Sequence, residues 1–351
     1  MAEETKKNIL FVIGNEYHLY SALVMYYKFF NSELFNFKMI ITKRPGNNRI
    51  NEAYELPFEY YLFEDYLNFN DFRSVKAYPD YESMLANVYH KVDEVYTYFD
   101  FTLLSSLIIK WVNRNPNSKS YMIQEGVGGY YTYKMPFYKK VKFYFTYLYI
   151  KYYRSIKNID FVYQYGCYPR IDYWKMFHPE EIKMNTKAIL EKLDLCIDNE
   201  TNTKIKKIFC FNKSFDSTKK YLFYMPIGQA RGSAEAKSKE LEYLEQLIKL
   251  ALINNYTFVM KIKSGVDSEI YHKLFGTRVQ IIDDKVPAEI IMSDMHNSAI
   301  VSAFSSAALH NVNNNRYYWI FPLLGFETNL KPPTKNIKLI SGISELQSVF
   351  E

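Results

Sequence analysis

The stretch NILFVI at residues 8–13 decides the fold class, because a short apolar run of this kind is typical of a strand buried on both faces of a parallel sheet. Strands and helices alternate along the residues that follow it. We expect helices over 21–30 and 102–111, and strands over 37–41, 94–98 and 118–124. This alternation predicts a doubly wound, Rossmann-like α/β sheet in the first half of the chain.

The second half repeats the alternation after polar interruptions at 198–207 and 212–220. We therefore expect an N-terminal domain over 1–200, a linker over 201–217 and a C-terminal domain over 218–351. The expected elements are strands at 221–225, 258–262, 279–282, 299–302 and 317–321, a helix over 234–253, and helices beginning at Ala288 and near Ser305. Two such domains facing each other predict a cleft lined by the carboxyl ends of strands, where open α/β sheets bind ligands.

The composition suits two globular domains, since 48% of the 351 residues are hydrophobic and 23% are charged. The abundance of Tyr and Phe, 34 and 26 residues, is compatible with stacking on sugars. Cys167, Cys196 and Cys210 have no CxxC spacing and form an odd set, which argues against a disulfide framework. The six histidines show no metal-ligand spacing, so we expect no metal and no other cofactor.

The N-terminus and the hydropathy predict a cytoplasmic protein. The start MAEETKK followed by a short apolar run is unlike a signal peptide, and no stretch approaches the roughly 18 uncharged apolar residues of a spanning helix. Nucleic acid is not an expected partner, because the basic residues are concentrated in one local run and the pI of about 8.8 falls short of the usual basic footprint.

That basic run covers residues 134–157 and is interleaved with aromatic residues. No Asp or Glu occurs between Gly126 and Asn158. One interpretation is a peripheral contact with an anionic membrane at its inner face, because lysines and aromatic rings suit the headgroup zone. The other is a helix of the N-terminal domain whose aromatic rings are core and whose lysines are solvated. Both interpretations stay open.

Two stretches carry candidate chemistry at strand ends. Gln124-Glu125-Gly126 follows an apolar strand end, where a carboxylate can act as a general base or can simply be an acidic turn residue before glycines. Ser305 and Ser306 follow the strand at 299–302, where hydroxyls can cap a helix or can also bind a phosphate together with free N–H groups.

Five short motifs, taken in chain order, resemble those of the bacterial sialyltransferases of glycosyltransferase families 52, 38 and 80. Those enzymes carry a D/E-D/E-G strand end, a GQP-like strand end, a K-P-H-P motif, a P-x-E loop and a pair of serines. The matching stretches are Gln124-Glu125-Gly126, Ile227-Gly228-Gln229, Lys261-Ile262-Lys263-Ser264, Pro287-Ala288-Glu289 and Ser305-Ser306. The opening ILFVIGNEYHLYSAL is similar to the family's strand followed by T-P-x-Q-L, with Asn15 and His18 in the polar places.

The resemblance implies a GT-B architecture and inverting transfer of sialic acid, or a related nonulosonic acid, from a CMP-activated donor to a glycan or glycolipid hydroxyl in capsule or lipooligosaccharide synthesis. Glu125 would be the base and Lys263 would assist the leaving phosphate. The implied donor-binding residues are Gly228, Gln229, Lys261, Glu289, Ser305 and Ser306. In this set the serines would hold the CMP phosphate, the glutamate would bind the ribose and the lysine would offset charge.

Two positions depart from the family pattern. Gln124 replaces the first acidic residue, and Lys263 stands where the relatives have histidine. Strand alternation places Lys261 and Lys263 on one face, where a lysine can neutralise a phosphate but is a poor proton donor near neutral pH. His296 or His310 could then supply the acid. The alternatives are a GT-B transferase using CMP-Kdo, a UDP-sugar or a GDP-sugar, and a noncatalytic glycan- or lipid-binding protein on the same fold.

Overall fold

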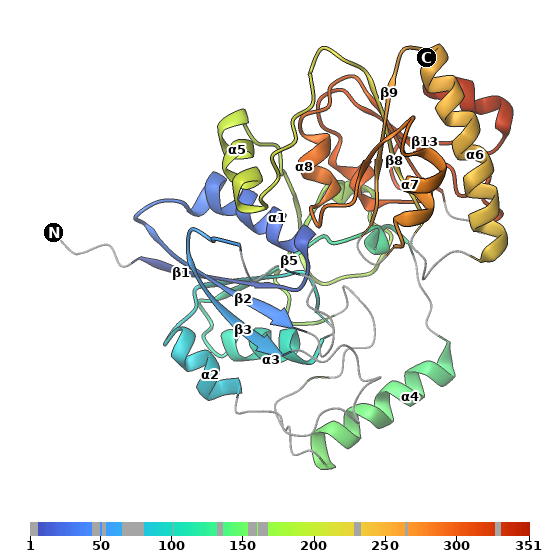
Figure 1. The fold of residues 1–351 in the computed structure, drawn as a ribbon. Helices are drawn as coiled ribbons and strands as arrows, with labels where there is room; N and C mark the ends of the chain where they lie inside the picture. Colours follow the sequence, from blue (N-terminus) through green and yellow to red (C-terminus); the bar gives the residue numbers. More distant parts are fainter. Residues whose placement is uncertain are drawn as a thin grey trace. The chain divides into compact units, whose positions relative to one another are not determined.

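The chain forms two compact units, Met1–Ile197 (unit 1) and Asp198–Glu351 (unit 2), each built around its own parallel sheet (Figure 1). The computed structural model describes residues 6–43, 50, 54–64, 81–100, 102–131, 136–153, 160, 168–227, 233–263, 266–326 and 331–351. Among these residues, no helix is both long enough and apolar enough to cross a bilayer.

Unit 1 contains a seven-stranded parallel sheet with the strand order β3-β2-β1-β4-β5-β6-β7. The strands are β1 (Lys7–Ile13), β2 (Phe35–Lys43), β3 (Glu59–Glu64), β4 (Glu94–Thr97), β5 (Lys119–Ile123), β6 (Tyr173–Met176) and β7 (Ile189–Lys192). The register pairs Phe11 with Tyr96, Tyr96 with Tyr121, and Tyr121 with Tyr173. Their rings stack in a row across the sheet, with centroids 4.5–4.8 Å apart, so part of the high aromatic content lies in this sheet.

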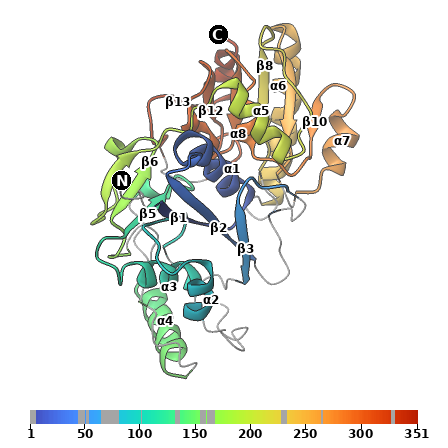
Figure 2. The same ribbon diagram turned by 90° about the vertical axis from the view of Figure 1, so that its left-hand side faces the viewer.

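The helices of unit 1 begin at capping residues that the sequence supplies. Asn15 caps α1 (Glu16–Met25), which continues as the π-helix η1 (Tyr26–Phe30), and Thr102 caps α3 (Leu103–Val112). The remaining helical segments are α2 (Tyr81–Val88), η2 (Gly128–Tyr130), α4 (Phe137–Leu148), η3 (Tyr149–Tyr153) and η4 (Pro179–Glu181). Figure 2 shows α2, α3 and α4 at the same end of this unit.

Unit 2 contains a six-stranded parallel sheet with the order β10-β9-β8-β11-β12-β13. The strands are β8 (Tyr221–Met225), β9 (Thr257–Lys261), β10 (Gln280–Ile282), β11 (Ala299–Ser302), β12 (Arg316–Trp319) and β13 (Ile337–Leu339). The helical segments are α5 (Asn199–Ile208), α6 (Ala234–Ile253), α7 (Glu269–Phe275), α8 (Ala288–Met292), η5 (Ser306–His310) and η6 (Ile343–Val349). Alternate strand residues such as Leu222, Tyr224 and Met260 share one core with Leu244 of α6 and Tyr271 of α7.

The predicted two-domain α/β fold with doubly wound parallel sheets is confirmed. Several elements differ from the expected ones. The first helix begins at Glu16 rather than near Ser21, because Asn15 provides its cap. Residues 201–217 were expected as a linker but contain most of α5. The sequence of this helix is mostly polar, yet Ile205 and Ile208 are buried. Strands β3, β6 and β7 were not predicted, because their residues lack a continuous apolar run.

Candidate functional site

Glu125 lies just beyond the carboxyl end of β5, where the sequence predicts a reactive carboxylate. Asn15 lies just beyond the carboxyl end of β1 and caps α1. Because β1, β4 and β5 are parallel neighbours in the sheet, these two strand ends meet at the same edge. The sheet therefore brings together two side chains that are 110 residues apart in the chain.

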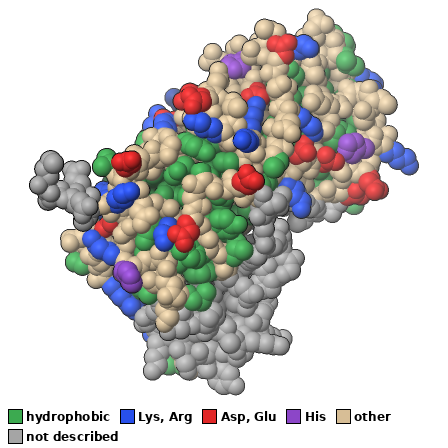
Figure 3. Space-filling model, turned by 60° about the vertical axis from the view of Figure 1, so that its left-hand side comes forward, with side chains coloured by type: hydrophobic (Ala, Val, Ile, Leu, Met, Phe, Trp, Pro, Cys, Tyr) green, Lys and Arg blue, Asp and Glu red, His purple; other side chains and the backbone are tan. Residues whose placement is uncertain are grey.

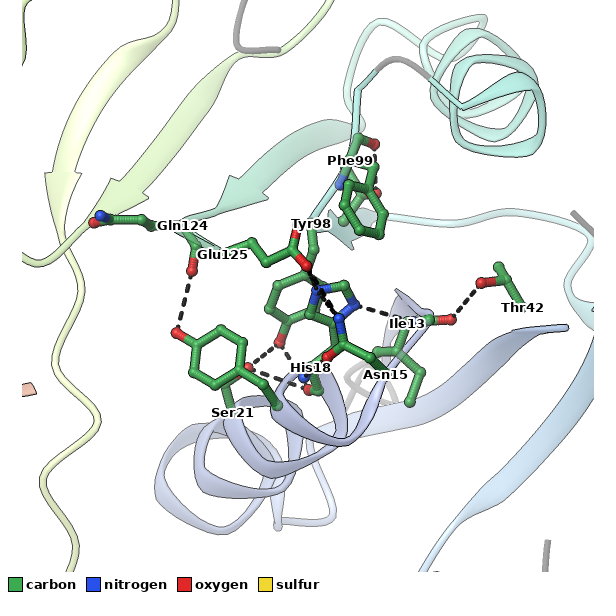
Figure 4. Close-up of polar contacts among 12 residues, drawn as sticks. Ile13, Asn15, His18, Ser21, Thr42, Tyr98, Phe99, Gln124 and Glu125 are labelled. Atoms are coloured by element: carbon green, nitrogen blue, oxygen red, sulfur yellow. Dashed lines mark hydrogen bonds and ion pairs between the residues drawn. The ribbon is translucent and has the colours of Figure 1, made fainter. Parts of the chain in front are cut away.

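Asn15 and His18 hold the Glu125 carboxylate between them (Figure 4). Asn15 Nδ2 donates a hydrogen bond to Glu125 Oε1 over 3.0 Å, and His18 Nε2 lies 3.2 Å from the same oxygen. The side chain of Glu125 is 30% exposed, whereas that of His18 is completely buried. Glu125 is thus held in a defined position and is still accessible to a reactant.

The tautomer of His18 follows from its neighbours. The backbone N–H of Gly14 donates to His18 Nδ1 over 3.0 Å, so this nitrogen is an acceptor and the proton resides on Nε2. Nε2 lies 3.2 Å from Glu125 Oε1 and 3.0 Å from Asn15 Nδ2, and because the amide nitrogen is itself a donor, the carboxylate oxygen is the acceptor available to that proton. Protonating His18 would require the Gly14 hydrogen bond to break inside a buried site, so the imidazole acts as a neutral donor that orients the carboxylate.

The ring of Tyr98 stacks on the ring of His18. Tyr98 was not predicted as a site residue. The two rings stack with centroids 4.0 Å apart and planes 8° from parallel, and Tyr98 Oη donates to His18 O over 3.0 Å. Ser21 makes a short hydrogen bond with the same hydroxyl. Burial raises the pKa of Tyr98, so the phenol stays protonated. Its place directly after β4, in VYTYFD, is the one sequence signal that could have identified it.

Two small features fix the backbone around this site. A side chain at Gly14 would place its Cβ 2.8 Å from Thr42 Oγ1, so only glycine allows the β1–α1 turn to approach β2. Gln124 is buried, donates from Nε2 to Gly126 O and accepts at Oε1 from Tyr130 Oη and Phe177 N. A carboxylate could not donate to Gly126 O, which gives a structural reason for Gln124 at the place of the first acidic residue in the sialyltransferase motif that this stretch resembles.

The candidate residues of unit 2 also gather near strand ends. Lys261 ends β9, is 6% exposed, and donates from Nζ to Ile262 O over 2.6 Å and to Asp284 O over 2.8 Å. Lys263 lies beyond the strand and is exposed. β9 ends at Lys261, so strand alternation does not extend to Lys263, and the prediction that the two lysines share one face stays a prediction; the charges of both act on Glu289.

Glu289, in the first turn of α8, lies beside His310 at the end of η5. The distance from Glu289 Oε1 to His310 Nε2 is 3.7 Å, too long for a hydrogen bond. Burial raises the pKa of Glu289 to about 7, although the charges of Lys263 and Lys261 act in the opposite direction. Burial lowers the pKa of His310 to about 3, so its ring is neutral near pH 7 and has no imidazolium proton to give.

Ser305 and Ser306 follow β11, as predicted. Ser305 Oγ accepts from Ala307 N over 3.2 Å and so caps η5, and its own N–H donates to Ser302 Oγ. The capping interpretation therefore has a physical basis, and phosphate binding stays a prediction. The helix expected near Ser305 is a 3₁₀ helix of five residues.

His296 does not belong to this group of residues. His296 precedes β11, so it lies at the opposite end of that strand from Ser305 and cannot share a site with it. Gly228 and Gln229 lie outside the described residues. Within the described parts of the chain, no three His, Cys, Asp or Glu side chains are grouped so that they could hold a metal ion.

No protein-family model and no curated protein matches this sequence. Three solved structures that resemble it are an α/β-galactoside α-2,3-sialyltransferase from Photobacterium phosphoreum, the wall teichoic acid polymerase TagF, and a UDP-GlcNAc 2-epimerase from Neisseria meningitidis. The TM-scores are 0.52, 0.50 and 0.50, and the identities 12%, 12% and 14%. The matches cover 96%, 100% and 98% of this chain and 99%, 80% and 90% of the other chains. At these identities the likeness shows the fold alone, which is two Rossmann-like domains of the GT-B type.

Proposed function

We propose that this protein is an inverting GT-B glycosyltransferase that transfers a sugar from a nucleotide-sugar donor to a hydroxyl of a glycan or glycolipid. The observation that carries the proposal is the Glu125 carboxylate at a strand end, oriented by Asn15 and a neutral His18. A general base needs a defined position and access to the proton that it removes, and Glu125 has both.

In the proposed reaction, the acceptor oxygen attacks the anomeric carbon while Glu125 takes the proton of the acceptor hydroxyl. The bond between the anomeric carbon and the donor phosphate breaks, and the nucleotide leaves with that phosphate. His18 keeps its Nε2 proton throughout and stabilises the position of the carboxylate. Asn15 adds a second donor to the same oxygen.

The donor that we propose is CMP-sialic acid or the CMP derivative of a related nonulosonic acid, with unit 2 as the nucleotide-binding unit. The grouping of Lys261, Lys263 and Glu289 supports it, because two cations beside a carboxyl suit a phosphate with an adjoining ribose. Ser305 and Ser306 would hold the phosphate. The resemblance of the motif order supports the CMP donor, and capsule or lipooligosaccharide synthesis is the setting that we propose with it.

A nucleotide panel tests the donor. We expect CMP to raise the melting temperature of the full chain more than CDP, UMP, UDP or GDP, because a ligand that binds only the folded state stabilises it. A larger shift with UDP would favour the second candidate, a transferase or related enzyme that uses a UDP-sugar, for which the fold of the UDP-GlcNAc 2-epimerase is the supporting observation. No shift with any nucleotide would favour a noncatalytic binding protein.

A transfer assay tests the base. Glu125→Gln should keep the melting-temperature shift with CMP and lower the transfer rate by roughly 10²–10⁴-fold. Glu180→Gln, at an exposed glutamate of the same unit, is the matched control and should leave the rate unchanged. A near wild-type rate for Glu125→Gln would remove Glu125 as the base. The peripheral membrane contact predicted for 134–157 is a separate proposal, because it concerns a different surface of unit 1.

A further inference from the structure

Helix α4 carries a row of apolar side chains whose aromatic members are exposed and whose aliphatic members, Val141 and Leu148, are half-buried. These residues recur at the spacing i, i+1, i+4, i+7, i+8 and i+11, which places them within an arc of about 120° on an α-helix. The α4 aromatic face consists of Phe137, Tyr138, Val141, Tyr144, Phe145 and Leu148. Phe137 is 81% exposed and Phe145 is 64% exposed, so rings that a globular core would bury face the solvent.

The opposite face of α4 is packed against unit 1. Phe143 and Tyr147 contact the core cluster that includes Leu104 and Ile108 of α3, and Thr146 is buried. The interpretation of this helix as one with core aromatic rings and solvated lysines holds for Phe143 and Tyr147, but not for the exposed rings such as Phe137 and Phe145. One face of α4 packs against unit 1, and the aromatic rings of the other face are exposed to solvent.

The charges around the α4 aromatic face are of one sign. Lys140 and Lys142 each lie about 40° outside one edge of the face, given 100° per residue, and Lys139 lies further round. The helix contains no acidic residue. The described surface in Figure 3 is different, because acidic and basic side chains are mixed across it.

We propose that α4 lies flat in the headgroup region of an anionic membrane, with the α4 aromatic face toward the acyl chains and the lysines toward lipid phosphates. Helices with a ring-rich apolar face flanked by lysines bind in this way. A second copy of the chain is a poor occupant, because a symmetric pairing of the face would place lysines against lysines. The proposal stands on α4 alone and does not depend on the transfer reaction.

Cosedimentation of the full chain with vesicles tests this proposal without any donor or acceptor. We expect binding to phosphatidylcholine vesicles that contain phosphatidylglycerol, weaker binding at high salt, and little binding to phosphatidylcholine alone. Lys140→Gln with Lys142→Gln, which removes the two lysines flanking the face, should weaken the partition coefficient roughly five-fold for each lysine removed. Binding of equal strength to neutral vesicles, or no binding to anionic ones at low salt, would overturn the proposal.

The aromatic contribution needs its own variants. Phe137→Ser with Phe145→Ser should weaken binding on the order of ten-fold, because the rings no longer bury in the headgroup zone. Leu252→Ser with Ile253→Ser, on an exposed part of α6, is the matched control and should bind as the wild type does. Equal loss in both pairs would contradict a specific role for α4.

A tryptophan probe distinguishes insertion from adsorption. Phe145→Trp should show a blue shift of its emission on adding anionic vesicles, together with quenching by lipids brominated on the acyl chains. Gel filtration completes the test: if Phe137→Ser with Phe145→Ser changes the oligomeric state of the chain and leaves vesicle binding intact, the occupant is a second copy and the membrane proposal fails.

Discussion

At the residue scale, the site of unit 1 depends on a buried neutral histidine. His18 accepts from Gly14 N, donates to Glu125, and stacks on Tyr98, so each side of the ring has a partner. A buried polar ring is stable only when its hydrogen bonds are made. His18 therefore contributes both to the orientation of Glu125 and to the stability of unit 1.

His18→Ala should lower the free energy of unfolding by about 2–4 kcal/mol, because the Gly14 N–H loses its acceptor, the stacking on Tyr98 is lost and a cavity remains. Urea denaturation followed by circular dichroism measures the change. His90→Ala, at an exposed position, serves as control and should stay within about 0.5 kcal/mol of the wild type. A loss below about 1 kcal/mol for His18→Ala would contradict the network described here.

The opposite pKa shifts of Glu289 and His310 cancel in their effect on the pH dependence of the stability of unit 2. Between pH 4.5 and 6.5 the folded pair holds one proton, on Glu289, because the pKa of Glu289 is raised to about 7 and that of His310 is lowered to about 3. The unfolded pair also holds one proton in this window, on His310. Because the proton counts are equal, the pair contributes no pH dependence to stability there.

Glu289→Gln should break this balance. The folded variant then holds no proton at the pair while the unfolded state still holds one, so the free energy of unfolding should fall as the pH drops below 6.5, by about 1.4 kcal/mol per pH unit relative to wild type. Urea midpoints at pH 5, 6 and 7 measure the difference. Glu242→Gln, at an exposed position of α6, should follow the wild-type profile; a parallel profile for Glu289→Gln would exclude the burial-driven shift.

At the scale of elements, one carboxylate of α6 forms hydrogen bonds with β8, with the segment that follows β8 and with α7. Glu240 of α6 is 1% exposed and accepts from Ile227 N over 2.7 Å, Tyr224 Oη over 2.8 Å and Tyr271 Oη over 3.2 Å. These donors belong to the segment just after β8, to β8 itself and to α7. The carboxylate thus positions the chain that leads into Gly228 and Gln229.

Glu240→Ala should lower the free energy of unfolding by about 3–5 kcal/mol, because three buried donors lose their acceptor. Glu245→Ala on the same helix removes a surface ion pair with Arg278 and should cost less than about 1 kcal/mol. Thermal denaturation of the two variants makes the comparison. Similar losses would mean that the Glu240 network contributes little.

At the scale of the whole molecule, each unit has a core of its own. In unit 2, one cluster of buried residues among those that the structure describes lies entirely between Leu222 and Phe350. Helix α5 adds contacts to this unit through Asn202 and Lys206, which both bond to Asp294 after α8. We therefore expect unit 2 to fold by itself when α5 is included.

Residues 198–351 expressed alone should fold and give a cooperative thermal transition. A fragment of 218–351, which begins at the boundary that the sequence predicts, should melt at a lower temperature because it lacks α5 and leaves Asp294 without these partners. Circular dichroism on both fragments makes the measurement. If the longer fragment is unfolded, or if the two melt alike, α5 is not an integral part of unit 2.

Local patterns in the chain were sufficient for most strands and for the ends of several helices. The apolar runs that became β1, β5, β8 and β11 were predicted because burial on both faces demands such runs. Short strands with exposed residues, such as β7, carry no such pattern and were missed. Helix α5 was missed because its buried residues are few and its sequence is otherwise polar.

The sequence by itself determined the two parallel α/β units and placed Glu125, Ser305 and Ser306 at strand ends, since apolar runs and turn residues are local features of the chain. Only the tertiary structure decided which side chains meet: β4 lies between β1 and β5, so His18 reaches Glu125 and stacks on Tyr98. It also decided that Glu289 is buried beside His310 while Lys263 is exposed. Burial and proximity depend on the order of strands in the sheet and on packing between distant segments, and neither is encoded in local periodicity.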